Sequence, residues 1–172
     1  MGNLLFSPSG RINKSDFMKG VGIIAVISAL IKVIPMFSVS LGGILSLLSL
    51  VLIFPLFCLM IKRSHDGGKS GWMSIVWFIL LLILIFIMSS IVPAMFGGDA
   101  YAEMKELTEA AVSEGAGLGE IIQISQEFQE GIAKNTALPS AILGFVVTMF
   151  WAFLINVFTG KDVEDNQFGP VA

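Results

Sequence analysis

Four long apolar runs alternate with short polar segments along the chain and predict membrane-spanning helices. A bilayer core about 30 Å thick requires roughly 20 helical residues. The runs that reach this length are residues 17–37, 41–61, 71–96 and 138–158. Lys19 and Lys32 are the charged residues of the first run, and the other three runs contain none. Pro35 and the glycines at 42 and 43 predict a tight turn, so the first two runs form a helical hairpin.

The segment 97–137 follows a different pattern, in which apolar residues recur every three or four positions among acidic ones. The recurring apolar positions are Ala100, Met104, Leu107 and Ala111, then Ile121, Ile124, Phe128 and Ile132. This spacing is typical of amphipathic helices, and the glycines within 115–119 predict a hinge between two of them. We expect Asn135 and Thr136 to end the second helix and Pro139 to begin the last span.

The predicted fold class is therefore all-α: a polytopic membrane protein with four transmembrane helices and an amphipathic helical hairpin between helices 3 and 4. Two roles fit the hairpin. Its apolar stripe either packs at the membrane, on the outer ends of the spans or in the interface, or docks a partner or a second copy. Binding of anionic lipid through this hairpin is disfavoured, because helices that do so are rich in Lys and Arg.

Composition supports the membrane assignment. Apolar residues make up 55% of the 172 residues, charged residues 13%, and the mean hydropathy is +0.88. A soluble domain usually carries about 25% charged residues. These values exclude a soluble globular domain, a disordered chain and a basic nucleic-acid binder, and they make the lipid bilayer the first expected partner.

The few charged residues are unevenly distributed among the segments outside the spans. Residues 1–19 and 62–70 are basic, whereas 97–137 holds eight acids against two lysines, and the tail 159–172 is also acidic. Because basic loops tend to stay in the cytoplasm, the N-terminus, the 62–70 loop and the C-terminal tail are predicted to be cytoplasmic. The acidic segment is then extracytoplasmic, and Lys32 is expected to reach the outer interface.

Cysteine and histidine counts limit the chemistry. Cys58 and His65 are the single residues of their types, so an intrachain disulfide is impossible. A structural zinc site needs about four Cys or His ligands, so we expect no metal and no cofactor.

Three polar stretches, residues 10–14, 62–72 and 166–170, are predicted to meet on the cytoplasmic side. Their candidate site residues are Arg11, Arg63, His65, Asp66, Lys69, Trp72 and Asn166. These side chains form either a hydrogen-bonded cluster that fixes the helices or a site for a phosphate or an anionic head group. The plainer interpretation is a hairpin turn with cations near the membrane surface and Trp72 as an interfacial anchor. The acidic tail is expected to dock on the basic segments by charge, screened by salt.

Together these stretches resemble the signature of domain-of-unknown-function family 805, the small YhaH-like inner-membrane proteins of bacteria. The matching runs, in order, are GRIN (10–13), KRSHDGGKSGW (62–72) and NQFGP (166–170). Lys62 and Ser64 stand where the family pattern has arginine and leucine, and the 97–137 segment looks longer than the family's usual outer loop. The resemblance implies an integral inner-membrane protein of bacterial type, and it implies no activity.

No arrangement of catalytic residues accompanies these stretches. His65 and Asp66 are sequence neighbours, which is an awkward geometry for a base and its orienting partner. The sequence predicts a non-enzymatic scaffold or accessory subunit that acts through a membrane-protein partner or a homo-oligomer. The alternatives are a cytoplasmic-face binder or sensor of anionic lipid or a phosphorylated ligand, and a small transporter or channel. The last is the least favoured, since the spans lack deep acidic groups.

Overall fold

The computed structural model describes residues 5–172 and consists of helices. In chain order they are α2 (Lys14–Val33), the 3-10 turn η1 (Ile34–Met36), α3 (Val39–Leu48), the 3-10 turn η2 (Ser49–Leu52), α4 (Ile53–Asp66), α5 (Met73–Phe96), α6 (Gly98–Ser113) and α7 (Leu118–Thr159). No strand occurs within residues 5–172, where a single β-bridge joins Asn166 and Gly169.

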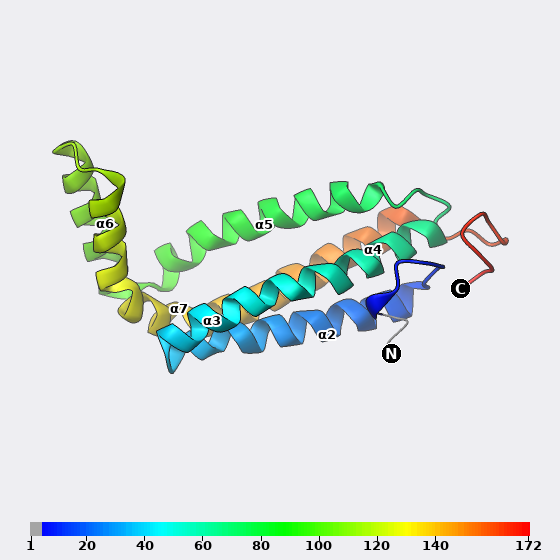
Figure 1. Cartoon of the computed structure of the whole chain (residues 1–172), viewed down its shortest axis with the longest axis horizontal. Coiled ribbons are helices and arrows are strands. Elements are labelled where there is room, and N and C mark those ends of the chain that lie inside the picture. Colours follow the sequence, from blue (N-terminus) through cyan, green and yellow to red (C-terminus); the bar gives the residue numbers. More distant parts are fainter. Residues whose placement is uncertain (1–4) are drawn as a thin grey trace.

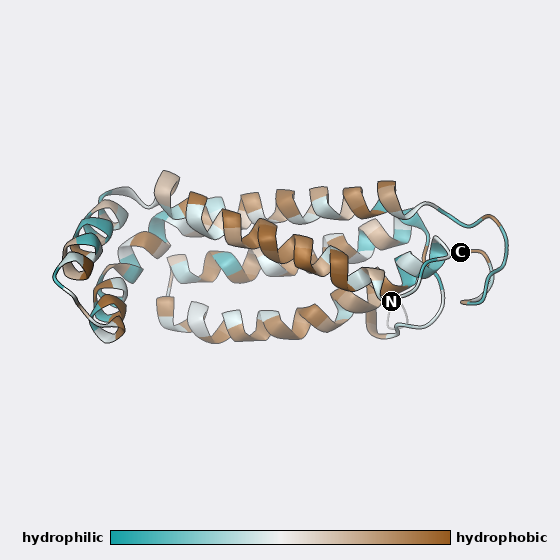
Figure 2. Cartoon of the chain, turned by 90° about the horizontal axis from the view of Figure 1, so that it is seen from above, coloured by the Kyte–Doolittle hydropathy of each residue, from teal (hydrophilic) through white to brown (hydrophobic). Residues whose placement is uncertain are grey.

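Four helical stretches are long and apolar enough to cross a membrane, which confirms the predicted fold class. They are Lys14–Met36, Val39–Asp66, Met73–Phe96 and Leu118–Thr159. We take the uncharged run 138–158 as the spanning part of the last one. These stretches run along a common axis, with both termini at one end (Figure 1). We call this end the N/C end and the opposite end the far end. Apolar residues dominate the length of the bundle and hydrophilic ones gather at its two ends (Figure 2).

Local capping determines where the first helices begin. The Asn13 side chain accepts a hydrogen bond from the backbone N–H of Asp16 (2.8 Å) and starts α2. The Ser38 side chain accepts one from the backbone N–H of Leu41 (3.4 Å) and starts α3. Such caps satisfy backbone donors that have no partner inside the helix.

The last helix differs from expectation. The prediction that Asn135 and Thr136 end a separate helix is wrong, because α7 is continuous and contains Pro139. The Asn135 amide donates to the Gly97 carbonyl (3.2 Å) and the Thr136 hydroxyl to the Ile132 carbonyl (2.8 Å), so neither side chain breaks the helix. A proline inside a helix removes one backbone donor and bends the axis. Figure 1 shows the change in direction of α7.

At the far end, α6 and residues 118–137 of α7 form what we call the end helix pair. It stands across the axis of the bundle (Figure 1). The two helices approach closely where Ala100 faces Gly131, since a Cβ at Gly131 would lie 3.0 Å from the Ala100 Cβ. Two helices thus occupy this segment, while the amphipathic character of the hairpin stays a prediction.

The hydrophobic core lies toward the N/C end. Its fully buried side chains include Phe17 and Val21 of α2, Leu59 of α4, and Trp151 and Ile155 of α7. The Trp151 indole N–H donates to the Trp77 carbonyl of α5 (2.8 Å), which satisfies its one polar atom. Because the core draws α2, α4, α5 and α7 together here, the polar segments that adjoin these helices at the N/C end are held close to one another.

Candidate functional site

Asp66, the last residue of α4, is the centre of the polar site at the N/C end. Its Oδ1 accepts from the Arg11 Nη2 (3.2 Å) and its Oδ2 from the Arg63 Nη1 (2.9 Å). The side chains of both ion pairs are at most 1% exposed. One buried carboxylate therefore faces two guanidinium groups that come from different polar stretches.

Arg63 connects α4 to the end of α7. Its Nε donates to the Asn156 side-chain oxygen (2.7 Å) and its Nη2 to the Gly160 carbonyl (2.5 Å). The Asn156 amide in turn donates to the Lys14 carbonyl at the start of α2 (3.2 Å). These contacts join the N/C ends of three helices through polar atoms with low exposure to solvent.

Arg11 connects the N-terminal segment to the C-terminal tail. Its Nη1 donates to the Glu164 carbonyl (2.8 Å) and its Nη2 to the Asp162 carbonyl (2.7 Å). The backbone N–H of Asp162 donates to the Asp66 carbonyl (2.7 Å). Arg11 thus holds the tail through its main chain, a mode of contact different from the side-chain charge match that we expected.

His65 lies beside this network and is covered by the tail. Its ring stacks on the Phe168 ring, with 3.9 Å between ring centroids and 2° between the planes. Its Nδ1 is 3.1 Å from the Gly10 carbonyl, which only accepts, so Nδ1 carries the proton in this contact. The Asn166 amide donates to the His65 carbonyl (3.0 Å). All three polar stretches therefore meet at this residue.

The two remaining candidates lie outside this network. The Lys69 ammonium donates to the Phe158 carbonyl (3.0 Å), where a cation complements the C-terminus of α7. Trp72 precedes α5 and is 77% exposed. We give the name polar cluster to the connected residues Arg11, Arg63, His65, Asp66, Asn156 and Asn166.

The turn after α4 requires a glycine because it touches the end of α7. A Cβ at Gly67 would collide with the Thr159 carbonyl oxygen. Gly68, which follows, has a φ of +67°, in the left-handed region that favours glycine. Gly67 and Gly68 thus permit the close approach that brings Asp66 and Arg63 to the tail.

Sequence reasoning missed two members of this arrangement. Asn156 was not assigned to the site, although an amide in an otherwise apolar span signals a polar partner. Phe168 was treated as part of a stretch and not as a ring that covers His65. Its partner could not be predicted, because stacking depends on how the tail folds back.

The polar cluster mainly binds segments of the chain to one another. All three nitrogens of Arg11 and all three of Arg63 donate to acceptors of the chain itself. An added phosphate or head group would have to displace these contacts. Within residues 5–172, no group of three or more His, Cys, Asp or Glu side chains is placed to hold a metal ion.

Comparison with known proteins covers nearly the whole chain. The model of the family described as protein of unknown function (DUF805) matches residues 5–170. No curated protein and no solved structure matches the chain. The matched range includes the three polar stretches that build the polar cluster as well as the four apolar helices. The chain belongs to the DUF805 family of proteins of unknown function.

Proposed function

We propose that the protein is a non-catalytic scaffold or accessory subunit of the bacterial inner membrane, which acts by association with another membrane protein or a second copy. The basic segments 1–19 and 62–70 support a cytoplasmic position for the N/C end, because basic loops tend to stay in the cytoplasm. The end helix pair then lies on the extracytoplasmic side.

The state of the polar cluster supports this choice over ligand binding. Arg11 and Arg63 are the strongest anion-binding groups of the site, and both are committed to Asp66 and to main-chain carbonyls. Buried arginine–carboxylate contacts of this kind fix the arrangement of the elements that carry them. The residues of the three polar stretches therefore stabilise the fold, and the surface that binds a partner lies elsewhere.

The observation that carries the proposal is an apolar surface on the end helix pair. Leu118 is 79% exposed, Val112 55% and Ile122 54%. These residues flank the turn between α6 and α7, and Leu118 and Ile122 precede the uncharged run 138–158 of α7. Lipid covers the exposed apolar side chains of the spans, whereas in our proposal a protein covers this group. Clustered apolar residues outside a membrane mark interaction surfaces.

Co-purification from native membranes in a mild detergent tests the proposal. We expect the wild type to retain a stoichiometric partner or a second copy. The double variant Leu118→Ser, Ile122→Ser should lose it, because both apolar contacts are removed. A matched control on the same turn of α7 is Glu120→Ser, Gln123→Ser, which changes two exposed polar residues and should retain the complex.

Each result separates the proposal from its rivals. Size-exclusion chromatography with light scattering distinguishes a homo-oligomer from a complex with a different protein. A partnerless monomer for the wild type contradicts the proposal. So does equal loss of the complex in both double variants, because that would show that the apolar side chains have no special role.

A further inference from the structure

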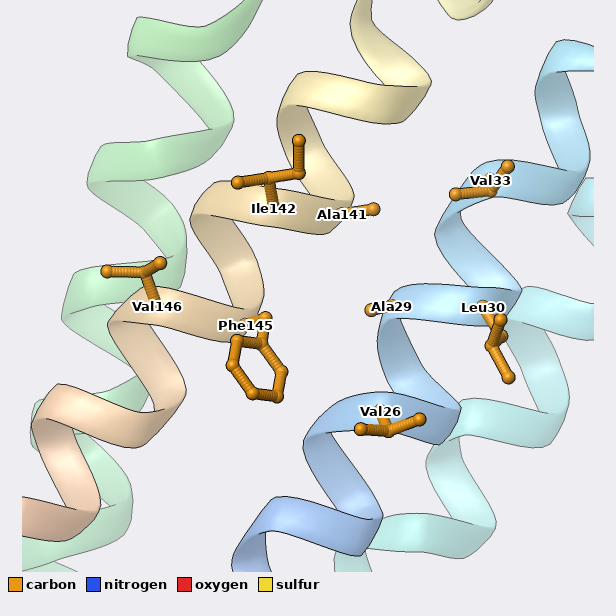
Figure 3. A pocket seen from close by; sticks show the side chains of 8 residues that line it. All are labelled: Val26, Ala29, Leu30, Val33, Ala141, Ile142, Phe145 and Val146. Carbon is orange, nitrogen blue, oxygen red and sulfur yellow. The ribbon is translucent and has the colours of Figure 1, made fainter.

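An apolar groove runs between α2 and α7 in the half of the bundle toward the far end. Its volume is about 290 Å³. The lining side chains are Val26, Ala29, Leu30 and Val33 of α2 and Ala141, Ile142, Phe145 and Val146 of α7. Figure 3 shows the lining side chains on the neighbouring helices α2 and α7, with Ala141 and Phe145 on the side of α7 that faces α2. Every lining residue is aliphatic or aromatic, so the groove accepts hydrocarbon.

Lys32 supplies a positive charge beside this groove. It directly precedes Val33, and its ammonium lies against α7, because a Cβ at Gly144 would be 2.5 Å from the Lys32 Nζ. Gly144 itself lies between the lining residues Ile142 and Phe145. Lys32 is four residues from Met36, the end of its span, and so roughly 6 Å inside it.

The Lys32 ammonium has no counter-ion within the part of the chain that the structure describes. No hydrogen bond or ion pair joins it to any of residues 5–172. A cation inside an apolar span is costly unless a negative group or water reaches it. The surroundings must therefore provide a negative group or water.

We infer that Lys32 and the groove form a binding site for an anionic phospholipid of the leaflet at the far end. One acyl chain lies in the groove, and the phosphate of the same lipid pairs with the Lys32 ammonium. A helix of another protein, about 10 Å across, is too thick for a groove of this volume. A single flexible chain matches both the apolar lining and the neighbouring charge.

Native mass spectrometry of the full-length protein tests this site. The detergent-solubilised protein is mixed with equal amounts of phosphatidylglycerol and phosphatidylcholine, and the ratio of the two retained lipids is measured. The wild type should favour phosphatidylglycerol. Lys32→Gln should lower the ratio about fivefold, the factor for about 1 kcal/mol contributed by one lysine near anionic lipid. Lys19→Gln, on the same helix but 67% exposed and paired with Asp16, should leave the ratio unchanged.

A second variant tests the groove separately from the charge. Ala29→Phe fills the groove while Lys32 stays in place, and it should reduce the number of retained lipids of both kinds. An unchanged ratio in Lys32→Gln overturns the inference, as does full retention in Ala29→Phe. Loss of a co-purifying protein in Lys32→Gln, with lipid retention intact, would instead assign Lys32 to a protein contact.

Discussion

Asp66 shows how much of the N/C end depends on one residue. Its carboxylate neutralises part of two guanidinium charges that the fold has removed from water. Removal of one partner from a buried charged group leaves the others without compensation, and the penalty is larger than the net value of the interaction. The same residue would contribute little if it were exposed.

Asp66→Asn should therefore destabilise the protein by about 3–5 kcal/mol. The measurement is the unfolding midpoint in one detergent, converted to a free energy by a denaturant titration. Asp16→Asn is the matched control, because the Asp16–Lys19 pair is exposed and its loss should shift the midpoint far less. Equal shifts of the unfolding midpoint for the two variants would show that the buried polar cluster stabilises the protein no more than an exposed ion pair does.

For individual residues, the sequence predicted that the polar side chains converge on one side of the membrane, but it did not predict their hydrogen-bond partners. Arg11, Arg63 and Asn166 were expected to converge because each follows or precedes a span that ends on the same side. Their acceptors could not be predicted, since Arg11 binds carbonyls of Asp162 and Glu164, which every residue possesses. Lys32 shows the same limit. Its reach toward Gly144 depends on how α2 and α7 are packed.

The C-terminal tail acts as an element that closes the N/C end. Its acidic side chains suggested docking by charge, yet Arg11 reaches its main chain, and the Glu164 side chain is exposed. Hydrogen bonds from a buried guanidinium to carbonyls are only weakly screened by salt. The tail should therefore stay docked at salt concentrations that disrupt surface ion pairs.

Amide hydrogen exchange of Asp162 measures this docking, because its backbone N–H donates to the Asp66 carbonyl of α4. Glu164→Gln removes a charge but keeps the carbonyl, and it should leave the protection factor unchanged. Arg11→Gln should lower it strongly. Release of the tail by Glu164→Gln, or by 1 M salt alone, would support the charge match instead.

The helices themselves were largely predictable from apolar length. The exception is α7. Asn135, Thr136 and Pro139 predicted an end between two helices, but the helix is continuous there. Local sequence cannot show that a neighbouring chain segment satisfies a polar side chain, as the Gly97 carbonyl does for Asn135. The helix consequently continues from the end helix pair into the bundle.

The polar cluster and the exposed apolar residues of the end helix pair lie at opposite ends of the molecule. The polar cluster joins the segments 10–14, 62–72 and 160–172 at the N/C end, while the exposed residues Val112, Leu118 and Ile122 lie at the other end. The match to the DUF805 model spans both ends. In our account the first end maintains the fold and the second makes contact with a partner.

Site-specific photo-crosslinking in native membranes tests this division of roles most directly. A photoreactive amino acid is placed at Leu118 of the end helix pair or at Gln167 of the tail, both of which are exposed. The account predicts a discrete adduct of higher mass from Leu118 and none above background from Gln167. An adduct from Gln167 with none from Leu118 would contradict it.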